Sequence, residues 1–242
     1  MNKIRWKIIG CALEGLDAMK LEMPCQDKIA RYRDEKISVI ALADGAGSAD
    51  LSHFGAERVT KIICRLIAEN FEKFLDAPES EIKSLILNEL LQELQLAADE
   101  HECELKDLAS TLMAAASDGE KYFMLIIGDG IAGIFKDGEI NLAAEPYTVF
   151  VTSKFVSMHT KILRGALENI NGFVLMSDGA ADSFYERKTK TLIPWLNDIA
   201  KECSELPEDE REKILLSDFE TIIRPRTLDD CSMILMCRED WQ

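Results

Sequence analysis

Three apolar segments of this sequence end in the same way, with an aspartate followed by a glycine. They are SVIALADGAGSA (38–49), FMLIIGDGIAGI (123–134) and GFVLMSDGAADSF (172–184). Nearly continuous apolar runs of this length are typical of β-strands that are buried on both faces. Each strand therefore brings a carboxylate to its end, at the border of a hydrophobic core.

These three carboxylates need a partner. A carboxylate at the buried end of a core strand costs several kcal/mol unless it is paired or binds a cation. No lysine or arginine lies within the next few residues of Asp44, Asp129 or Asp178. A local salt bridge is therefore a poor explanation, and the sequence predicts a cation shared between the strand ends.

Two other Asp-Gly pairs have a simpler interpretation. Asp118 and Asp137 are flanked by polar residues, and a new strand-like segment begins directly after each pair. Aspartate and glycine tolerate the backbone conformations that tight hairpins need. We expect both pairs to be hairpin turns.

Further acidic residues precede strand-like segments. Asp229 and Asp230 stand before CSMILMC (231–237), and Asp27 stands before another candidate strand. A pocket of carboxylate oxygens selects Mg²⁺, Mn²⁺ or Ca²⁺ over zinc. Three scattered histidines and unpaired cysteines do not offer a usual structural zinc site.

The rest of the chain alternates between helical and strand-like blocks. Apolar residues recur at helical spacing from Val59 to Phe74 and again after Pro78, and further helices are expected at roughly 191–203 and 207–223. With no linker and no repeat, this order predicts one α+β domain over residues 1–242. Strands are expected at 4–12, 37–43, 110–117, 121–129, 132–143, 147–152, 173–178 and 231–237.

Composition narrows the function classes. A formal net charge of −16 argues against a nucleic-acid partner, because phosphate backbones need a basic surface. Seven cysteines without a Cys-x-x-Cys pair indicate reduced thiols and a cytoplasmic location. No apolar run approaches the roughly 18 residues that span a bilayer, so no membrane partner is expected. The sequence gives no information on oligomeric state.

Six short motifs follow one another along the chain. They are QD (26–27), DGAGS (44–48), STL (110–112), GDG (128–130), SDGAAD (177–182) and DDCS (229–232). Together they resemble the metal-dependent protein phosphatases of the 2C class (PPM family), in particular the compact bacterial branch. The similarity extends from about residue 10 to residue 238, which is almost the whole chain.

The resemblance implies a four-layer α/β/β/α sandwich with two central antiparallel sheets and a metal site in a cleft at one end. Asp44, Asp178 and Asp229 would bind a first metal ion. Asp44 would bridge to a second ion, which also takes the carbonyl of Gly45. Asp27 would orient metal-bound water without binding the ions itself.

The resemblance also implies the cofactors and the reaction. Two Mn²⁺ or Mg²⁺ ions would be bound, and Asp129, Asp178 and Asp182 match the positions that hold a third, weaker ion in some members. The substrate would be a phosphorylated protein, hydrolysed at phosphoserine or phosphothreonine, with phosphotyrosine left open. Two cations about 3.5–4 Å apart can acidify a bridging water and neutralise phosphoryl charge.

The sequence departs from the family pattern in the groups that would hold the phosphate. Ala46 stands where many members carry a histidine proposed as general acid, and His53 is the nearest substitute. No arginine lies between residues 6 and 30, so Lys20 is the candidate phosphate ligand. Gln26 replaces a water-binding glutamate. For His53 and Lys20, an ordinary surface role is the alternative.

Segment 139–172 lies where the family places a flap near the cleft, and its role is either substrate contact or an ordinary sheet edge. CQDKIAR (25–31) also has the Cys-x₅-Arg spacing of cysteine-dependent phosphatases. Because Asp27 would put a negative charge into that loop, which has no glycine, we regard the spacing as coincidence. A second alternative is a catalytically weak regulatory or phosphoprotein-binding module with the same fold.

Overall fold

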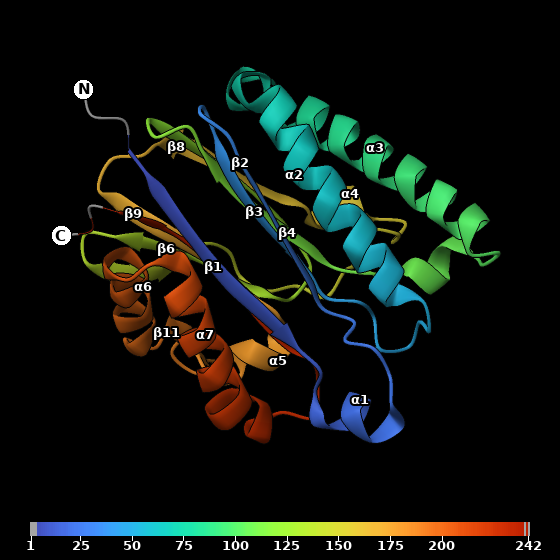
Figure 1. Cartoon of the computed structure of the whole chain (residues 1–242). Coiled ribbons are helices and arrows are strands. Elements are labelled where there is room, and N and C mark those ends of the chain that lie inside the picture. The colour runs from blue at the N-terminus through green and yellow to red at the C-terminus, as the bar shows by residue number, and fades with distance from the viewer. Residues whose placement is uncertain (1–3, 240, 242) are drawn as a thin grey trace.

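Two five-stranded antiparallel sheets face each other in the computed structural model, which describes residues 4–239 and 241. The first sheet has the order β1-β12-β9-β6-β7 and the second has the order β2-β3-β4-β5-β8 (Figure 1). The first consists of β1 (Trp6–Leu13), β12 (Cys231–Arg238), β9 (Ile170–Met176), β6 (Ile131–Lys136) and β7 (Glu139–Leu142). The second consists of β2 (Lys28–Arg33), β3 (Ser38–Ala43), β4 (Leu112–Ser117), β5 (Lys121–Ile127) and β8 (Lys161–Ala166).

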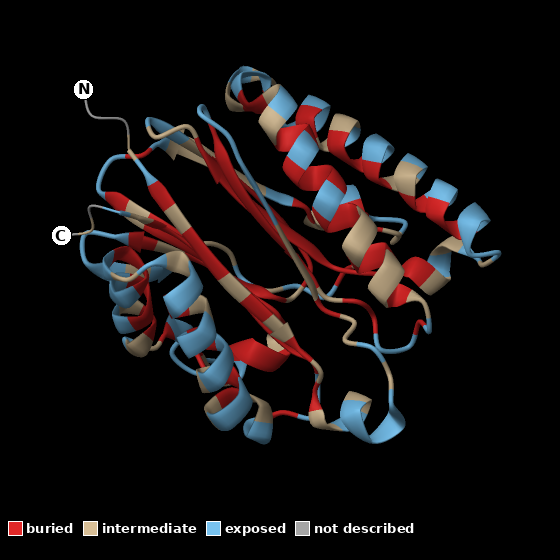
Figure 2. Ribbon diagram, in the orientation of Figure 1, coloured by how far each residue is buried: buried red, intermediate tan, exposed pale blue. Residues whose placement is uncertain are grey.

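A pair of long helices covers the outer face of each sheet. The helices α2 (Ser52–Asp76) and α3 (Glu79–Glu100) pack on the second sheet, and α6 (Trp195–Glu205) and α7 (Glu208–Asp218) pack on the first. Figure 2 shows that each helix turns a buried stripe toward its sheet and an exposed stripe toward solvent. The predicted α+β class and the α/β/β/α layering are confirmed.

The four layers enclose three apolar cores. The core between the sheets includes Trp6, Leu42 and Phe173, and the cores under the two helix pairs are larger. Strand β3 is buried along its whole length because its alternate side chains enter two different cores, which explains its unbroken apolar run. Full burial of a large apolar side chain contributes about 1.5–3 kcal/mol.

The two ends of the described chain lie in one sheet. Strand β1 pairs with β12 along its whole length, from Trp6 opposite Arg238 to Leu13 opposite Cys231. Strand β12 then pairs with β9 from the middle of the sequence. The terminal strands thus share a sheet with a central one. No helix in the described part of the chain has the length and apolarity needed to cross a membrane.

The expected strand at 147–152 is wrong. This segment is irregular and leads into the short helix α4 (Val156–His159), and the strand that borders the second sheet is β8 instead. Segment 147–152 lies across strand ends rather than beside a strand, because Tyr147 N donates to the Gly128 carbonyl and Val151 N to the Ser110 carbonyl.

The remaining elements are short, and several connect the layers at one end of the sandwich. The helix expected from residue 191 begins at Trp195, because Thr191 and Leu192 pair with Tyr185 and Glu186 instead. The helix expected at 207–223 has a π-helical last turn. The short elements are α1 (Leu16–Leu21), η1 (Leu105–Leu108), α5 (Asp178–Ala181), β10 (Tyr185–Glu186), β11 (Thr191–Leu192), η2 (Phe219–Ile223) and η3 (Arg224–Arg226).

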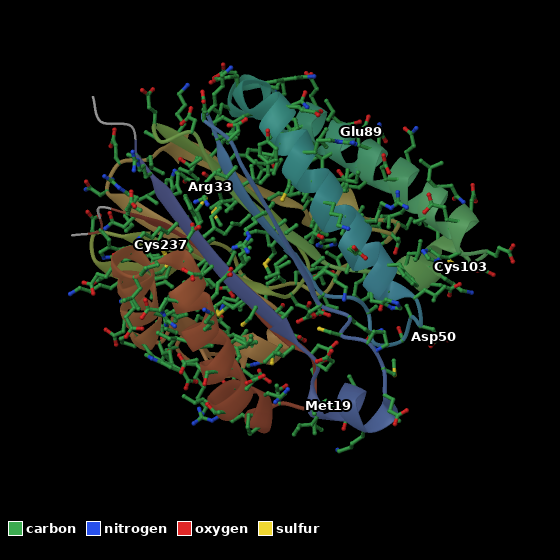
Figure 3. The ribbon with its side chains drawn as sticks, viewed as in Figure 1. Met19, Arg33, Asp50, Glu89, Cys103 and Cys237 are labelled. Carbon is green, nitrogen blue, oxygen red and sulfur yellow. The ribbon has the colours of Figure 1, made fainter. Side chains whose placement is uncertain are left out.

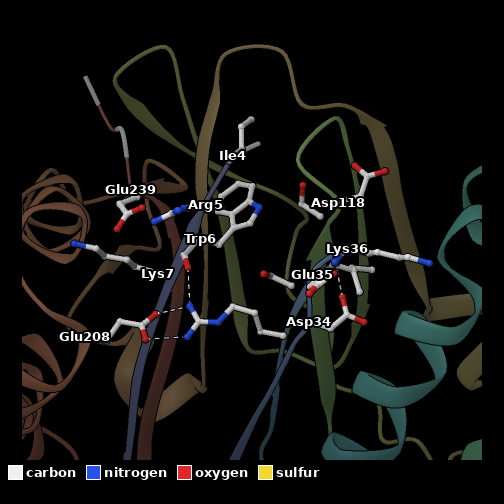
Figure 4. A pocket seen from close by; sticks show the side chains of 14 residues that line it. Ile4, Arg5, Trp6, Lys7, Asp34, Glu35, Lys36, Asp118, Glu208 and Glu239 are labelled. Carbon is white, nitrogen blue, oxygen red and sulfur yellow. Dashed lines mark hydrogen bonds and ion pairs between the residues drawn. The ribbon is translucent and has the colours of Figure 1, made fainter. Parts of the chain in front are cut away.

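The sandwich has two distinct ends. Figure 3 shows Met19 and Asp50 at one end and Arg33 toward the other. Near Arg33 lies a cavity of about 530 Å³ between the starts of β1 and β3 and the end of β4 (Figure 4). There the guanidinium of Arg33 binds Glu208 at 2.8 and 3.0 Å and the Trp6 carbonyl at 2.7 Å. This contact ties β2 to α7.

Candidate functional site

Four carboxylates converge at the end of the sandwich that carries α1 and α5. Asp44 follows β3, and Asp178 follows β9. Asp27 lies directly before β2, and Asp229 lies two residues before β12. Burial raises the pKa of Asp44 well above its usual value, and the charges of Asp27, Asp178 and Asp229 raise it further. Asp178 is therefore one of the neighbours whose charge acts on Asp44. We call Asp27, Asp44, Asp178 and Asp229 the acidic cluster.

Asp27 is the most deeply buried member of the acidic cluster. It is 1% exposed, and neither carboxylate oxygen has a hydrogen-bond partner that meets normal geometry. Burial raises the pKa of Asp27 to about 7, although the nearby hydroxyls of Ser177 and Ser232 act in the opposite direction. A buried acid without a matching base is costly in a purely structural role, which makes this position a candidate for chemistry.

The acidic cluster has the chemistry of a cation site. Asp178 Oδ1 is also buried without a hydrogen-bond partner. Among the described residues, no lysine, arginine or histidine forms an ion pair with any member of the cluster. Neighbouring carboxylates without a basic partner fit a hard divalent cation. The donor set therefore fits Mg²⁺ or Mn²⁺.

The carboxylates converge without forming a finished metal cage. Within residues 4–239 and 241, no three histidine, cysteine, aspartate or glutamate side chains are already arranged to hold a metal ion. Like charges repel when no counter-ion lies between them, so the side chains would have to draw together around an incoming cation.

The carbonyl of Gly45 is available beside Asp44. The Asp44 carbonyl accepts a hydrogen bond from Thr111 N at 2.8 Å, and Thr111 Oγ1 binds Asp44 N at 2.9 Å. No backbone N–H in the described chain donates to the Gly45 carbonyl in the turns and loops. The STL motif thus fixes the backbone of Asp44 and leaves the next carbonyl free.

Asp230, next to Asp229, has a structural role that the sequence does not reveal. Its two oxygens accept hydrogen bonds from Gly15 N at 2.7 Å and Gln26 N at 2.5 Å. Asp230 therefore fastens the segments before α1 and β2 to the start of β12. The pairing of a buried acid with backbone N–H groups far away in sequence gives no local signal.

Gln26 also fastens a loop. Its side-chain amide nitrogen donates to Ser52 Oγ at 2.6 Å and to the Ala49 carbonyl at 3.2 Å. These contacts hold the loop after Asp44 against the segment that carries Asp27. The predicted contact of Gln26 with metal-bound water would have to use the amide oxygen.

The Asp-Gly pairs fall into two kinds, as the sequence predicted. Gly119 and Gly138 have φ values of +94° and +80° and form the hairpin turns between β4 and β5 and between β6 and β7. Gly45, Gly130 and Gly179 do not have positive φ.

At these three positions the glycine is required by space. A Cβ on Gly179 would overlap the Asp230 carbonyl oxygen, and one on Gly45 would lie 2.7 Å from Ser52 Oγ. One on Gly130 would lie 2.8 Å from the Met176 carbonyl oxygen. The backbone beside these aspartates therefore packs directly on neighbouring segments.

Asp129 and Asp182 lie with Asp178 in one pocket of about 370 Å³, but both already have partners. Asp129 Oδ2 accepts a hydrogen bond from Thr148 Oγ1 at 2.6 Å. Asp182 Oδ1 forms an ion pair with the guanidinium of Arg187 at 2.9 Å. The structure brings the three predicted third-site carboxylates together and also gives two of them a competing contact.

Neither predicted phosphate-handling side chain contacts the acidic cluster. Lys20 lies on α1, 67% exposed, and pairs with Asp17 at 3.0 Å. His53 lies in the first turn of α2, its ring 4.1 Å from that of Phe54, and partial burial together with the charge of Lys28 lowers its pKa. No hydrogen bond or ion pair among the described residues connects either side chain to the cluster.

The Cys-x₅-Arg spacing is confirmed as coincidence. Residues 28–31 belong to strand β2 and cannot wrap a phosphate. Arg31 donates to the Ile8 carbonyl at 3.1 Å and pairs with Glu212 at 2.6 Å. Cys25 Sγ donates to the carbonyl of Asp27 at 3.5 Å.

Comparison with solved structures gives the same fold. A bacterial serine phosphatase matches with a TM-score of 0.68 at 14% identity, over 98% of this chain and 100% of that one. The S. agalactiae serine/threonine phosphatase matches with a TM-score of 0.65 at 18% identity, over 96% and 99%. RsbX in complex with magnesium matches with a TM-score of 0.59 at 14% identity, over 98% and 100%.

Sequence comparison gives the family. No curated protein matches the chain at a significant level. The family model described as protein phosphatase 2C matches residues 14–215, which include Asp27, Asp44 and Asp178 and leave out Asp229. Since this match extends over most of the sequence, the chain belongs to the protein phosphatase 2C family.

Proposed function

We propose that this protein is a metal-dependent phosphoprotein phosphatase that hydrolyses phosphoserine or phosphothreonine monoesters. The observation that carries the proposal is the convergence of four carboxylates from both sheets without a lysine or arginine to neutralise them. Family membership supports the reaction class. Residues 1–242 would act as one phosphatase unit, in the cytoplasm and on phosphorylated proteins.

The acidic cluster would hold two Mn²⁺ or Mg²⁺ ions. Asp44, Asp178 and Asp229 would supply carboxylate oxygens, and Gly45 would supply its carbonyl. When bound, such ions lower the pKa of a coordinated water and offset the charge that develops on the phosphoryl group. Phosphate-ester hydrolysis is among the slowest uncatalysed reactions, so this charge compensation is the main catalytic requirement.

Asp27 would orient the water bound by the cations. Burial raises the pKa of its carboxyl in the metal-free protein, and cations bound at Asp44 and Asp229 would lower it again, leaving a carboxylate that accepts a hydrogen bond from that water. The hydroxyls of Ser177 and Ser232 lie beside Asp27 and would fix its orientation. His53 as general acid and Lys20 as phosphate ligand remain predictions that depend on movement of α2 and α1, because neither contacts the cluster.

The test is hydrolysis of p-nitrophenyl phosphate with Mn²⁺ or Mg²⁺ added, followed by phosphoserine, phosphothreonine and phosphotyrosine peptides. We expect turnover that depends on the cation and stops with EDTA. Cation-dependent thermal stabilisation without turnover on any substrate would instead indicate a phosphoprotein-binding module. If the added cation produced no thermal stabilisation and no turnover, the metal assignment itself would be contradicted.

A further inference from the structure

The hairpin β10–β11 places two basic side chains beside the acidic cluster. Arg187 and Lys190 line the same pocket of about 370 Å³ as Asp178. We propose that this hairpin is the substrate-anchoring element, in which Arg187 binds the phosphate group and Lys190 binds an acidic residue next to it. The inference rests on the phosphatase function proposed above and adds its phosphate ligand and its substrate class.

The lining of this pocket carries both charges. Its acidic residues are Asp129, Glu145, Asp178 and Asp182, and its basic residues Arg187 and Lys190 come from the hairpin. The charge of Asp178 also contributes to holding the pKa of Arg187 high, after the larger effect of Asp182, so the guanidinium is near the acidic cluster. A phosphate seated in this pocket would contact the guanidinium and cations bound at Asp178 together.

Both basic side chains are held by contacts that are easy to exchange. Arg187 pairs with Asp182 at 2.9 Å, and these side chains are 77% and 56% exposed. Lys190 pairs with Glu145 at 3.2 Å, at 61% and 60% exposure. Exposed ion pairs of this kind contribute about 0–1 kcal/mol. A phosphate dianion, which guanidinium binds through two parallel hydrogen bonds, is therefore a competitive partner.

The base of the hairpin is anchored in the core. Tyr185 pairs with Leu192, and Ile193 N donates to the Phe184 carbonyl at 2.9 Å. Phe184 is fully buried, its ring 5.3 Å from that of Trp195. The fold thus fixes the base of the hairpin and leaves the side chains of its tip exposed.

The net charge of the chain makes such an element necessary. At −16 the protein repels a phosphorylated, acidic segment at long range. Lys20, the candidate from sequence, lies on α1 and does not line this pocket. Arg187 and Lys190 are the basic residues that do, within the described chain. The preferred substrate is therefore a phosphopeptide with an aspartate or glutamate beside the phosphorylated residue.

Four variants test the proposal: Arg187→Ala, Arg187→Lys, Lys190→Ala and the control Lys188→Ala. Lys188 is an exposed residue of the same hairpin that does not line the pocket. Thermal melting with and without Mn²⁺ checks that each variant folds and still binds the cation. Kinetics are measured on p-nitrophenyl phosphate and on two phosphoserine peptides, one with acidic and one with neutral flanking residues. Binding of inorganic phosphate to the Mn²⁺-loaded protein is measured by calorimetry.

We expect Arg187→Ala to raise KM on all three substrates and to weaken phosphate binding by about tenfold, the loss of one charge-assisted contact. Arg187→Lys should recover only part of the lost phosphate affinity, because lysine lacks the planar guanidinium that donates two parallel hydrogen bonds. Lys190→Ala raises KM only for the acidic peptide, and Lys188→Ala changes nothing.

Equal KM values and equal phosphate affinity for Arg187→Ala and Lys188→Ala would overturn the proposal even if the wild type is an active phosphatase. A wild type without turnover would contradict the proposed function, and the phosphate calorimetry would then still decide the role of Arg187.

Discussion

The negative charge of Asp178 helps to raise the pKa of the Asp44 carboxyl, although the two residues follow strands of opposite sheets. Asp44 ends β3 in the second sheet, and Asp178 begins α5 directly after β9 in the first. The two halves of the sandwich thus meet through a pair of acids. In the absence of a cation, the repulsion between the two carboxylates works against the packing of the two sheets. A bound cation would attract both carboxylates and so stabilise this packing.

Replacing Asp178 with asparagine tests this pair directly. Asp178→Asn keeps the shape of the side chain and removes one anionic ligand, so we expect turnover on p-nitrophenyl phosphate to fall at least about 100-fold. Stabilisation by Mn²⁺ should disappear at the same time, because a ligand stabilises a fold only while it binds the native state. Enzyme kinetics and thermal melting with and without Mn²⁺ measure both effects.

Asp137→Asn is the matched control for this substitution. Asp137 also precedes a glycine, but it lies in an exposed hairpin with φ of 54°, a conformation that asparagine adopts readily. We expect unchanged turnover and an unchanged response to Mn²⁺. Normal metal-dependent activity in Asp178→Asn would show that the metal ligands lie elsewhere.

The buried acid Asp27 makes the stability of the metal-free protein depend on pH. Its pKa rises from the usual 3.8 to about 7 on folding, so between these values the folded state binds the extra proton. The stabilisation that comes from binding this proton is fully present below about pH 4 and is lost as the pH rises through 7. In EDTA we therefore expect the free energy of unfolding to fall by about 2–3 kcal/mol from pH 5 to pH 8.

Urea unfolding at pH 5, 6, 7 and 8 measures this slope. Asp27→Asn cannot gain or lose the proton, so its slope should be smaller by the same amount and its metal-free stability at pH 8 should be higher. An identical pH dependence in wild type and variant would show that Asp27 titrates normally.

Much of the fold was accessible from the sequence, because its signals are local. Continuous apolar runs predicted the central strands, and the helical spacing around Val59 predicted α2. The strand expected at 147–152 was wrong, since β-rich composition cannot tell a strand from a segment that is held across strand ends by two backbone hydrogen bonds. The border strand β8 was missed because its basic residues Lys161 and Arg164 interrupt the apolar pattern.

The candidate site was accessible only in part, because several of its contacts are non-local. Asp44, Asp129 and Asp178 stood out as acids at the ends of apolar strands. The hydrogen bonds of Asp230 to Gly15 N and Gln26 N join segments far apart in sequence and leave no pattern. The same holds for Arg187. In the sequence it looks like an ordinary surface charge, and only the folded hairpin places it against Asp182, five residues earlier.

Thiol alkylation should leave the activity unchanged. Cys25 and Cys103 are half-buried and the other five are buried, and burial raises the pKa of both half-buried thiols. A thiol with a raised pKa reacts slowly with alkylating agents. Treatment of the native protein with iodoacetamide near pH 7 should therefore leave cation-dependent turnover unchanged. Complete inactivation, with one cysteine labelled by mass spectrometry, would support thiol chemistry instead.

The glycines beside the acidic cluster should be intolerant of alanine for reasons of space. In Gly179→Ala the new Cβ overlaps the carbonyl oxygen of Asp230, a backbone atom that cannot rotate away. We expect the free energy of unfolding to drop by about 1–3 kcal/mol or more, with weaker binding of Mn²⁺ as the backbone shifts. In the control Gly47→Ala the nearest atom, Gln26 Oε1, lies 4.0 Å away, so the change should stay within about 0.5 kcal/mol. Equal stability of the two variants in urea unfolding would contradict this packing.

Arg211 is a buried positive charge that lies away from the acidic cluster. Its side chain, on the buried face of α7, is 1% exposed and pairs with Glu202 at 3.1 Å and Asp218 at 3.9 Å, and its Nε has no hydrogen-bond partner. Burying an incompletely bonded charge often costs more than the ion pairs return. Arg211→Met, which keeps the apolar volume, should therefore leave the free energy of unfolding unchanged or raise it by about 1–4 kcal/mol.

Arg211→Ala should lower the free energy of unfolding by about 2–5 kcal/mol, the cost of a large cavity. Lys213→Met, on the same helix and 80% exposed, controls for the loss of positive charge. A loss of several kcal/mol in Arg211→Met but not in Lys213→Met would show that the ion pairs themselves stabilise the packing of α7 on the first sheet.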